Sequence, residues 1–442
     1  MLKEYPGQLT AARNEKEEKL RKQLSALFDG MMKALYKSGG AQLSIDILAD
    51  PRVRKFIDTH ASVLDSGFEQ VKMSEAMRRR LQRSDFIFSG LKAFHELNEA
   101  FPSLIDENGD RKSFERFLND VRSIDSTYNE NYLRAEYNFV VASADMAAKW
   151  DGFMKDGDRY NLQYRTQNDD HVRPEHAALD GVTLPPSDPF WEEYYPPNGW
   201  NCRCTVVQVR KSKYPATPHD EAMALGEVAL QKDSKGIFRF NPGIEQKTFP
   251  DYNPYTIRRC RDCDIPKDQT KFVAYIPDNE LCAACKIVRA MLGHYSQVPT
   301  SKGKVRIHSK HGEKESAVNI SIARYLAEKY GMEIDLLPVE YRHPDADSYN
   351  RTLGRKQEYK ISSGSKSSID GRLRKGASQA DDVVIRIDNE VDLKFLADAI
   401  KGRVCQCEEL KSVMIIYQGQ DLTLSRKQIM SRDFKIQQED FK

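Results

Sequence analysis

Hydrophobic positions follow different patterns in the first and last thirds of the chain. In residues 14–37, leucine, phenylalanine and methionine recur mostly at intervals of three or four, as along one face of an amphipathic helix. Similar spacing continues towards residue 150, so we expect an α-helical N-terminal region over 1–145. In residues 305–442, segments of helical period alternate with short apolar runs, which is typical of an α/β domain with a central sheet.

The elements of this last region can be assigned from their period. Apolar positions spaced three or four apart predict helices over 313–331, 367–380 and 391–402, the first of which ends at Gly331. Alternating or continuous apolar runs predict strands over 332–339, 348–354, 355–362, 381–388 and 411–419.

The middle of the chain lacks both patterns. Residues 146–211 contain all three tryptophans and a run of prolines, which favours a small, irregular α+β module rich in loops. Residues 212–256 and 294–304 are polar and without clear period, so both are interpreted as linkers. Residues 257–290 hold two CxxC pairs. We therefore expect a multidomain protein, as the length of 442 residues also indicates.

The composition is that of a soluble globular protein, with 40% hydrophobic and 30% charged residues. No apolar run approaches the roughly 18 residues that span a bilayer, and the N-terminus lacks the apolar core of a signal peptide. We therefore expect synthesis in the cytoplasm and no membrane partner. The net charge of +2 does not indicate a partner by itself.

The eight cysteines form four close pairs. Two pairs are CxxC turns separated by eighteen residues, so their four thiolates can surround one tetrahedral metal ion. A segment with so little apolar content needs such a cross-link in order to fold. Because four thiolates leave no open coordination position, we predict a structural Zn²⁺ bound by Cys260, Cys263, Cys282 and Cys285.

The stretch HVRPEHAALDG at 171–181 and the CRC at 202–204 concentrate residue types that bind metals or transfer protons. The CRC cysteines could join the two histidines in a mixed metal site, or they could be buried thiols. No nucleophile stands at a recognisable spacing, and Pro174 and Gly181 mark tight turns. We therefore favour a structural polar network made by His171, Arg173, His176, Asp180, Cys202 and Cys204. Cys405 and Cys407 are interpreted as core or surface thiols.

Residues 345–360 combine acids with a lysine. Glu358 and Lys360 stand two apart on a predicted strand and point to the same face, and Asp347 would lie on the neighbouring strand. Paired carboxylates can hold Mg²⁺ or Mn²⁺, which neutralises a phosphate and activates water, and a lysine can stabilise the resulting charge. A solvated hairpin with an ion pair is the alternative. The candidate catalytic residues are Glu315, Asp347, Glu358 and Lys360, with Glu313 and Asp345 as competitors for the first two roles.

Basic residues surround this acidic pattern, which suits a phosphate backbone. The candidates for binding RNA or DNA are Arg355, Lys356, Lys366, Arg372, Arg374 and Lys375. In its glutamate, aspartate and ExK lysine, the domain resembles the PD-(D/E)xK nucleases, and more closely the C-terminal tRNase domains of contact-dependent inhibition toxins. The resemblance implies a restriction-endonuclease-like central sheet, metal-dependent cleavage of tRNA or DNA, and an immunity protein as a partner. A nuclease fold used only for binding is the alternative.

Trp150, the run YRTQNDDHVRPEHAALDG at 164–181 and PNGWNCRC at 197–204 follow one another in a characteristic order. Over 146–211 the chain thereby resembles the phage Mu F-like head morphogenesis family. The resemblance implies a minor capsid protein of a phage or prophage, located in the virion and made in the bacterial cytoplasm, with portal and capsid proteins as partners. We predict a head protein that carries a nuclease toxin domain. The alternative is a purely structural virion protein whose C-terminal domain binds nucleic acid or a partner without catalysis.

Overall fold

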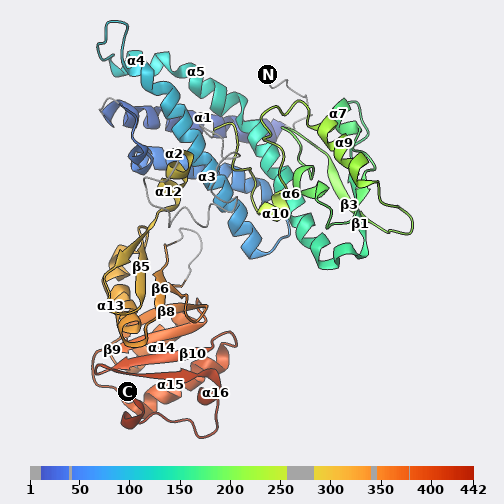
Figure 1. Cartoon of the computed structure of the whole chain (residues 1–442). Coiled ribbons are helices and arrows are strands. Elements are labelled where there is room, and N and C mark those ends of the chain that lie inside the picture. Colours follow the sequence, from blue (N-terminus) through green and yellow to red (C-terminus); the bar gives the residue numbers. More distant parts are fainter. Residues whose placement is uncertain (1–10, 39–41, 256–282, 340–345, 378) are drawn as a thin grey trace. The chain divides into compact units, whose positions relative to one another are not determined.

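The computed structural model describes residues 11–38, 42–255, 283–339, 346–377 and 379–442. The chain divides into two compact units, Met1–Leu292 and Gly293–Lys442. The first unit is mainly helical and the second contains a mixed sheet (Figure 1), which confirms the expected multidomain organisation. Within the described residues, no helix combines the length and apolar character that crossing a membrane requires.

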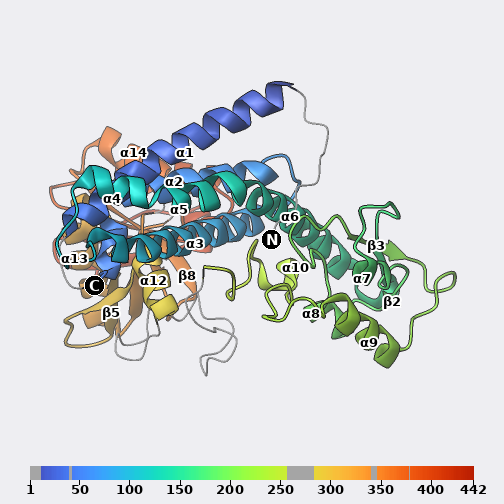
Figure 2. The same cartoon turned by 90° about the horizontal axis from the view of Figure 1, so that it is seen from above.

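Helices form the framework of the first unit (Figures 1 and 2). Side-chain caps define where two of them begin: Asp50 accepts from the N–H of Arg52, and Ser74 from the N–H of Met77. The apolar faces of these helices share one core, which confirms the helical N-terminal region. The helices are α1 Ala11–Ser38, α2 Pro51–Asp65, α3 Glu75–Ala100, α4 Phe114–Asp120, α5 Arg122–Asp125, α6 Leu133–Asp156 and α12 Ala283–Leu292.

A small antiparallel sheet with the strand order β2-β1-β3 follows α6. Its core contains Trp150 from α6, Tyr164 from β1 and Trp191 from α8, so aromatic residues that distinguish this region in the sequence form its interior. The elements are β1 Asn161–Arg165, α7 Pro174–Ala177, β2 Thr183–Leu184, α8 Phe190–Glu193, β3 Thr205–Val209 and α9 His219–Ala229.

Residues 212–255 are part of the folded unit, so the expectation of a linker is wrong for them. Helix α9 packs against α7 and α8, and α10 Pro242–Glu245 packs on α6. Phe240, Phe249 and Tyr255 lie in the core of the helical bundle. The sequence suggests a linker because these buried aromatic residues are scattered among polar ones, at intervals that match neither a helix nor a strand.

An eight-stranded mixed sheet forms the centre of the second unit, in the order β11-β10-β9-β8-β7-β6-β5-β4. Strand pairs β5/β6, β8/β9 and β9/β10 are parallel, and the other neighbours are antiparallel. The strands are β4 Tyr295–Val298, β5 Lys304–His308, β6 Glu333–Leu336, β7 Ser348–Asn350, β8 Arg355–Ser362, β9 Asp382–Ile387, β10 Ser412–Tyr417 and β11 Gln420–Ser425.

Helices cover both faces of this sheet. Helix α13 Glu313–Tyr330 packs on one face, in a core that includes Val384 of β9. Helices α14 Lys366–Ala377 and α15 Leu393–Gln406 pack on the other face, with Val383 and Ile385 in their core. Successive strand residues point to opposite faces, so the continuous apolar run of β9 contributes to both layers.

All three helices and all five strands predicted for this unit are present, although their ends differ by a few residues. Residues 294–304, expected to be a linker, contain β4 and the start of β5. Strands β5 and β11 were also not predicted. Strands β4 and β11 lie at the two edges of the sheet, where partial burial weakens the apolar pattern that identifies a strand. The proposed similarity to the restriction endonuclease sheet stays a prediction.

Candidate functional site

Asp347, Glu358 and Lys360 converge on the sheet of the second unit. Glu358 and Lys360 stand two apart on β8 and share a face, and Asp347 directly precedes β7, which pairs with β8. Lys360 Nζ lies 2.5 Å from Glu358 Oε1 and 3.7 Å from Asp347 Oδ2. The structure therefore brings together three of the four predicted catalytic residues.

Hydrogen bonds from three sides hold Asp347. Its Oδ2 accepts from the backbone N–H of Tyr359 at 2.8 Å, and its Oδ1 accepts from the side-chain amide of Asn319 at 3.1 Å. Its own N–H donates to Glu358 Oε2 at 3.0 Å. Asn319, on α13, also lies 3.0 Å from Nε2 of His311. Asn319 and His311 were not predicted from the sequence, where the one available signal was a polar residue on the buried face of α13.

The acidic groups of this cluster repel one another. Burial and the charge of Asp347 raise the pKa of Glu358 to about 7, although its hydrogen bond with Lys360 acts in the opposite direction. Burial lowers the pKa of Lys360, but hydrogen bonding and charge interactions with nearby carboxylates outweigh burial and raise it. Glu315 is one of those carboxylates. The cluster therefore favours uptake of a proton or a cation.

The remaining acidic candidates lie at the edge of this cluster or beyond the described residues. Glu315 and its competitor Glu313 are exposed in the first turn of α13. The charge interaction with Lys360 involves Glu315, which favours Glu315 over Glu313 as the additional acid. Asp345, the competitor of Asp347, lies outside the described residues.

The predicted nucleic-acid-binding residues lie on β8 and α14. Arg355 Nη1 is 3.4 Å from Asp382 Oδ1, so part of its charge is already compensated; Lys356 follows it on β8. The last turn of helix α14 lies beside β8. A Cβ at Gly376 of this turn would lie 3.5 Å from Cγ of Glu358. A helix with exposed cations therefore borders the acidic cluster. That helix begins at Lys366 and exposes Arg372, Arg374 and Lys375.

In the first unit, the histidine and CRC motifs form a second cluster. His176, on α7, and Cys202 and Cys204, just before β3, place their ligand atoms within 4.8 Å of one another. Nδ1 of His176 is 3.8 Å from Sγ of Cys202 and 3.9 Å from Sγ of Cys204. Hydrogen bonding between the two thiols lowers the pKa of Cys202 and raises the pKa of Cys204. His171 is exposed and does not belong to this group.

Arg173 and Asp180 bind neighbouring loops. Arg173 Nη2 donates to the carbonyl oxygen of Trp200 at 2.5 Å. Asp180 Oδ1 accepts from the N–H of Thr166 at 2.8 Å and from its hydroxyl at 3.1 Å. Hydrogen bonds thereby connect both ends of the 171–181 stretch to neighbouring loops, one at Trp200 and one at Thr166.

The predicted zinc knuckle lies mostly outside the described residues. Cys260, Cys263 and Cys282 fall there, while Cys285 is a buried residue of α12. The structural zinc site therefore stays a prediction. Near the end of α15, Cys405 is exposed and Cys407 is half-buried.

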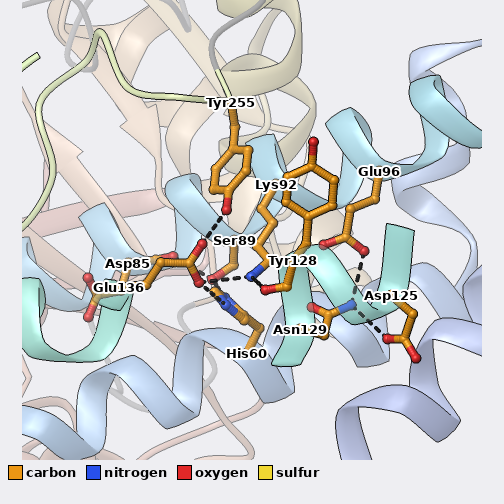
Figure 3. Close-up of polar contacts among 10 residues, drawn as sticks. All are labelled: His60, Asp85, Ser89, Lys92, Glu96, Asp125, Tyr128, Asn129, Glu136 and Tyr255. Atoms are coloured by element: carbon orange, nitrogen blue, oxygen red, sulfur yellow. Dashed lines mark hydrogen bonds and ion pairs between the residues drawn. The ribbon is translucent and has the colours of Figure 1, made fainter. Parts of the chain in front are cut away.

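A third polar cluster, which the sequence analysis missed, lies inside the helical bundle (Figure 3). Lys92 of α3 donates to Glu136 of α6 and to the carbonyl oxygen of Tyr128, each at 2.8 Å. Glu136 also accepts from the hydroxyl of Tyr255 and lies 3.2 Å from Nε2 of His60. Burial by itself raises the pKa of Glu136, but the charge of Lys92 and the contact with His60 lower it to about 2. In the sequence, the one signal of this cluster was that Lys92 and Glu136 stand at apolar positions of their helices.

Comparison with known proteins gives matches to phage proteins. Residues 107–207 match the model of a family described as "Phage Mu protein F like protein". The chain is 31% identical over 167 residues to the "Putative capsid assembly protein F" of Escherichia phage Mu, which is 36% of this chain and 34% of that protein. It is 35% identical over 79 residues to the "Mu-like prophage FluMu F protein" of Haemophilus influenzae, which is 16% of this chain and 19% of that protein.

The matches therefore span about a third of the length of the phage Mu relative and a fifth of the Haemophilus relative. No solved structure matches the chain. The family match runs from just before α4 to β3, and it includes α6 and the His176–Cys202–Cys204 cluster. It begins within the helical bundle, upstream of residue 146. Over residues 107–207, the chain is therefore similar to the phage Mu F-like proteins, as its histidine and CRC motifs predicted.

Proposed function

We propose that this chain is a minor head protein of a phage or prophage and that it takes part in capsid assembly. The observation that carries this proposal is the match of residues 107–207 to the Mu F-like family, supported by the name of the phage Mu relative. On this proposal the protein is made in the bacterial cytoplasm, resides in the virion and contacts portal and capsid proteins.

The test is to purify phage particles on a density gradient and to detect the chain with an antibody. We expect it in head-containing fractions and not in free tails, and we expect deletion of its gene to reduce the yield of filled heads. A chain that is missing from purified particles, together with normal head formation in the deletion strain, would contradict the proposal.

We further propose that the second unit is a metal-dependent nuclease in which Asp347 and Glu358 hold Mg²⁺ or Mn²⁺. The convergence of these acids with Lys360 is the observation that carries this proposal. Carboxylate oxygens are the ligands that these hard cations prefer. The raised pKa of Glu358 fits them too, because a cation would relieve the same repulsion as a proton. When bound, the cation stabilises charge on a phosphate and lowers the pKa of a water molecule.

The chain's own residues would orient and bind the substrate. Asn319 and the N–H of Tyr359 fix the carboxylate of Asp347. The ammonium group of Lys360 lies beside the acids, where it can stabilise developing negative charge on a phosphate. Exposed Arg372 and Arg374 on α14 supply charge for a nucleic-acid backbone. We propose tRNA as the substrate and an immunity protein, encoded nearby, as the inhibitor that protects the producing cell.

The test is to incubate the purified full chain with tRNA and duplex DNA, with Mg²⁺, Mn²⁺ or a chelator. We expect metal-dependent cleavage of tRNA, and we expect Glu358→Gln and Lys360→Met each to slow it by about 100-fold or more. Glu333→Gln changes an exposed glutamate on β6 and should cleave like the unmodified chain. If a folded chain cleaves neither nucleic acid with any of these metals, the nuclease proposal is wrong.

One feature of the same cluster favours a second candidate, binding without catalysis. Glu358 is 3% exposed and already forms a close ion pair with Lys360, so the acids could serve only to stabilise the fold. In that case the chain would bind RNA, DNA or a protein partner and leave it intact. Gel-shift measurements would then show binding that weakens in Arg372→Ala/Arg374→Ala and does not change with chelator or in Glu358→Gln.

A further inference from the structure

We propose that His176, Cys202 and Cys204 bind one Zn²⁺ ion, at a site separate from the CxxC pairs. Zinc lies about 2.0 Å from a histidine nitrogen and about 2.3 Å from a thiolate, so a tetrahedral angle places the two ligand atoms about 3.6 Å apart. The distances from Nδ1 to the two sulfurs, 3.8 and 3.9 Å, exceed this by a few tenths of an ångström. One ion can therefore reach all three atoms with small side-chain adjustments.

The donor set favours zinc over other uses of these residues. Two thiolates and an imidazole suit a borderline-soft cation such as Zn²⁺, and they do not suit Mg²⁺ or Ca²⁺. A nucleophilic cysteine–histidine pair uses one sulfur for one imidazole, whereas here two sulfurs, one buried and one half-buried, approach the same ring nitrogen. A disulfide between Cys202 and Cys204 would leave His176 without thiolates to share a metal with, and mass spectrometry distinguishes this alternative.

The loop that carries the cysteines is held in position by contacts that involve no metal. The N–H of Cys202 donates to the carbonyl oxygen of Gly199 at 3.1 Å, and Asn201 adopts a left-handed conformation with φ of 56°. Arg173 lies against this turn, because a Cβ at Gly199 would come within 2.9 Å of its Nη1. The same Arg173 directly precedes α7, the helix that carries His176. The ligand-bearing segments are therefore already brought together by supporting contacts of the kind that orient metal ligands.

Further contacts hold the arginine between the two cysteines. Arg203 forms two hydrogen bonds with the carboxylate of Asp169, at 2.5 and 2.8 Å, and its carbonyl oxygen accepts from Gln167 Nε2 at 3.0 Å. Arg203 is thereby bound to Asp169, while the sulfurs of both neighbouring cysteines lie within 4 Å of Nδ1 of His176.

Three protein ligands leave one coordination position. Among the described histidines, cysteines and acids, the group contains these three residues and no fourth. A water molecule or a group from another protein would complete the tetrahedron, as at zinc sites that keep an open position. The ion would link α7 to the segment before β3 and thereby stabilise the small module, whose sheet joins only three strands.

The experiment measures cobalt binding to the full chain, since Co²⁺ bound by thiolates absorbs in the near ultraviolet. The parent protein is the Cys260→Ser/Cys263→Ser variant, which removes the predicted knuckle, stripped of metal with chelator and reductant. We expect one equivalent of Co²⁺ with a thiolate charge-transfer band, displaced by Zn²⁺. Cys202→Ser and His176→Ala should weaken binding by at least about tenfold. Cys405→Ser/Cys407→Ser should bind as the parent does.

Cys204→His provides a variant that retains a ligand at each position. It should still bind cobalt, with about half the charge-transfer absorbance of the parent because one thiolate remains. The proposal is overturned if the folded parent gives no thiolate band, if Cys202→Ser binds cobalt as tightly as the parent, or if mass spectrometry shows a Cys202–Cys204 disulfide that persists under mild reduction. These outcomes are independent of nuclease activity and of presence in the virion.

Discussion

Lys92 Nζ lies 2.8 Å from Glu136 Oε2 inside the helical bundle, and the two side chains are 0% and 2% exposed (Figure 3). The pair joins α3 to α6 at a position where two apolar faces meet. Removing charges from water is costly, so such a pair adds little net stability over a well-packed apolar pair, but loss of one partner leaves a buried, uncompensated charge. The Lys92–Glu136 pair thereby favours one relative position of α3 and α6.

The first prediction concerns this pair. Lys92→Met should destabilise the first unit by about 3–5 kcal/mol, because Glu136 would lose its main charge partner. All three tryptophans lie in the first unit, so tryptophan fluorescence during urea unfolding reports on it alone. The control is Lys55→Met, which changes an exposed lysine of α2 and should alter stability by about 0.5 kcal/mol or less. If Lys92→Met unfolds at the same urea concentration as the control, the pair is unimportant.

The second prediction concerns pH. Burial raises the pKa of Glu96 to about 8, so the folded state binds a proton that the unfolded state releases near its ordinary value of 4.5. The corresponding stability is present below pH 4.5 and is lost as pH rises towards 8. Glu96→Gln mimics the neutral acid and should reduce this loss. Urea unfolding should therefore show that the free energy of unfolding of Glu96→Gln, relative to wild type, increases between pH 5 and pH 8. The increase should be up to about 1.4 kcal/mol per pH unit.

Glu107→Gln is the matched control for that measurement, because Glu107 is exposed. It should leave the pH dependence unchanged. A Glu96→Gln chain whose stability follows the same pH curve as wild type would show that Glu96 is ionised in the fold, which contradicts a raised pKa for this group.

The third prediction concerns the hydroxyl of Tyr255, which donates to Glu136. Tyr255→Phe should destabilise the first unit by about 1.5–3 kcal/mol, the usual range for a hydrogen bond to a charged group. Tyr252→Phe, three residues earlier and half-buried, should have a smaller effect. If Tyr255→Phe and Tyr252→Phe lower the free energy of unfolding equally, as monitored by tryptophan fluorescence, this hydroxyl does not hold residues 250–255 on the bundle.

The fourth prediction concerns Asn319, which positions Asp347 through a 3.1 Å hydrogen bond. If the proposed nuclease function holds, Asn319→Ala should raise the Mn²⁺ concentration needed for half-maximal tRNA cleavage by about 10–100-fold, the typical cost of losing a group that orients a metal ligand. High Mn²⁺ should restore most of the rate, which a misfolded site would not allow. Ser321→Ala, on the same helix, contacts Arg386 instead and should retain the normal metal requirement.

The polar cluster around Asp347 and the core of the helical bundle could be predicted from the sequence only in part. Glu358 and Lys360 were predicted to share a face because the two-residue period of a strand is local, and Asp347 because a turn returns the chain directly to the neighbouring strand. Asn319 was not predicted, since its contact with Asp347 spans 28 residues and depends on how α13 packs. Likewise, the position of Phe249 and Tyr255 in the bundle core depends on packing and not on any periodic spacing.

The sequence by itself determined the helical first region, the order of helices and predicted strands in the second unit, and the similarity to Mu F-like proteins, because periodic patterns and contiguous motifs are local properties. Only the tertiary structure decided that His176 meets two sulfurs 26 and 28 residues away while His171 stays exposed. It also paired Lys92 with Glu136 across 44 residues. Such contacts depend on how whole elements pack, and the pattern within any one element does not contain that information.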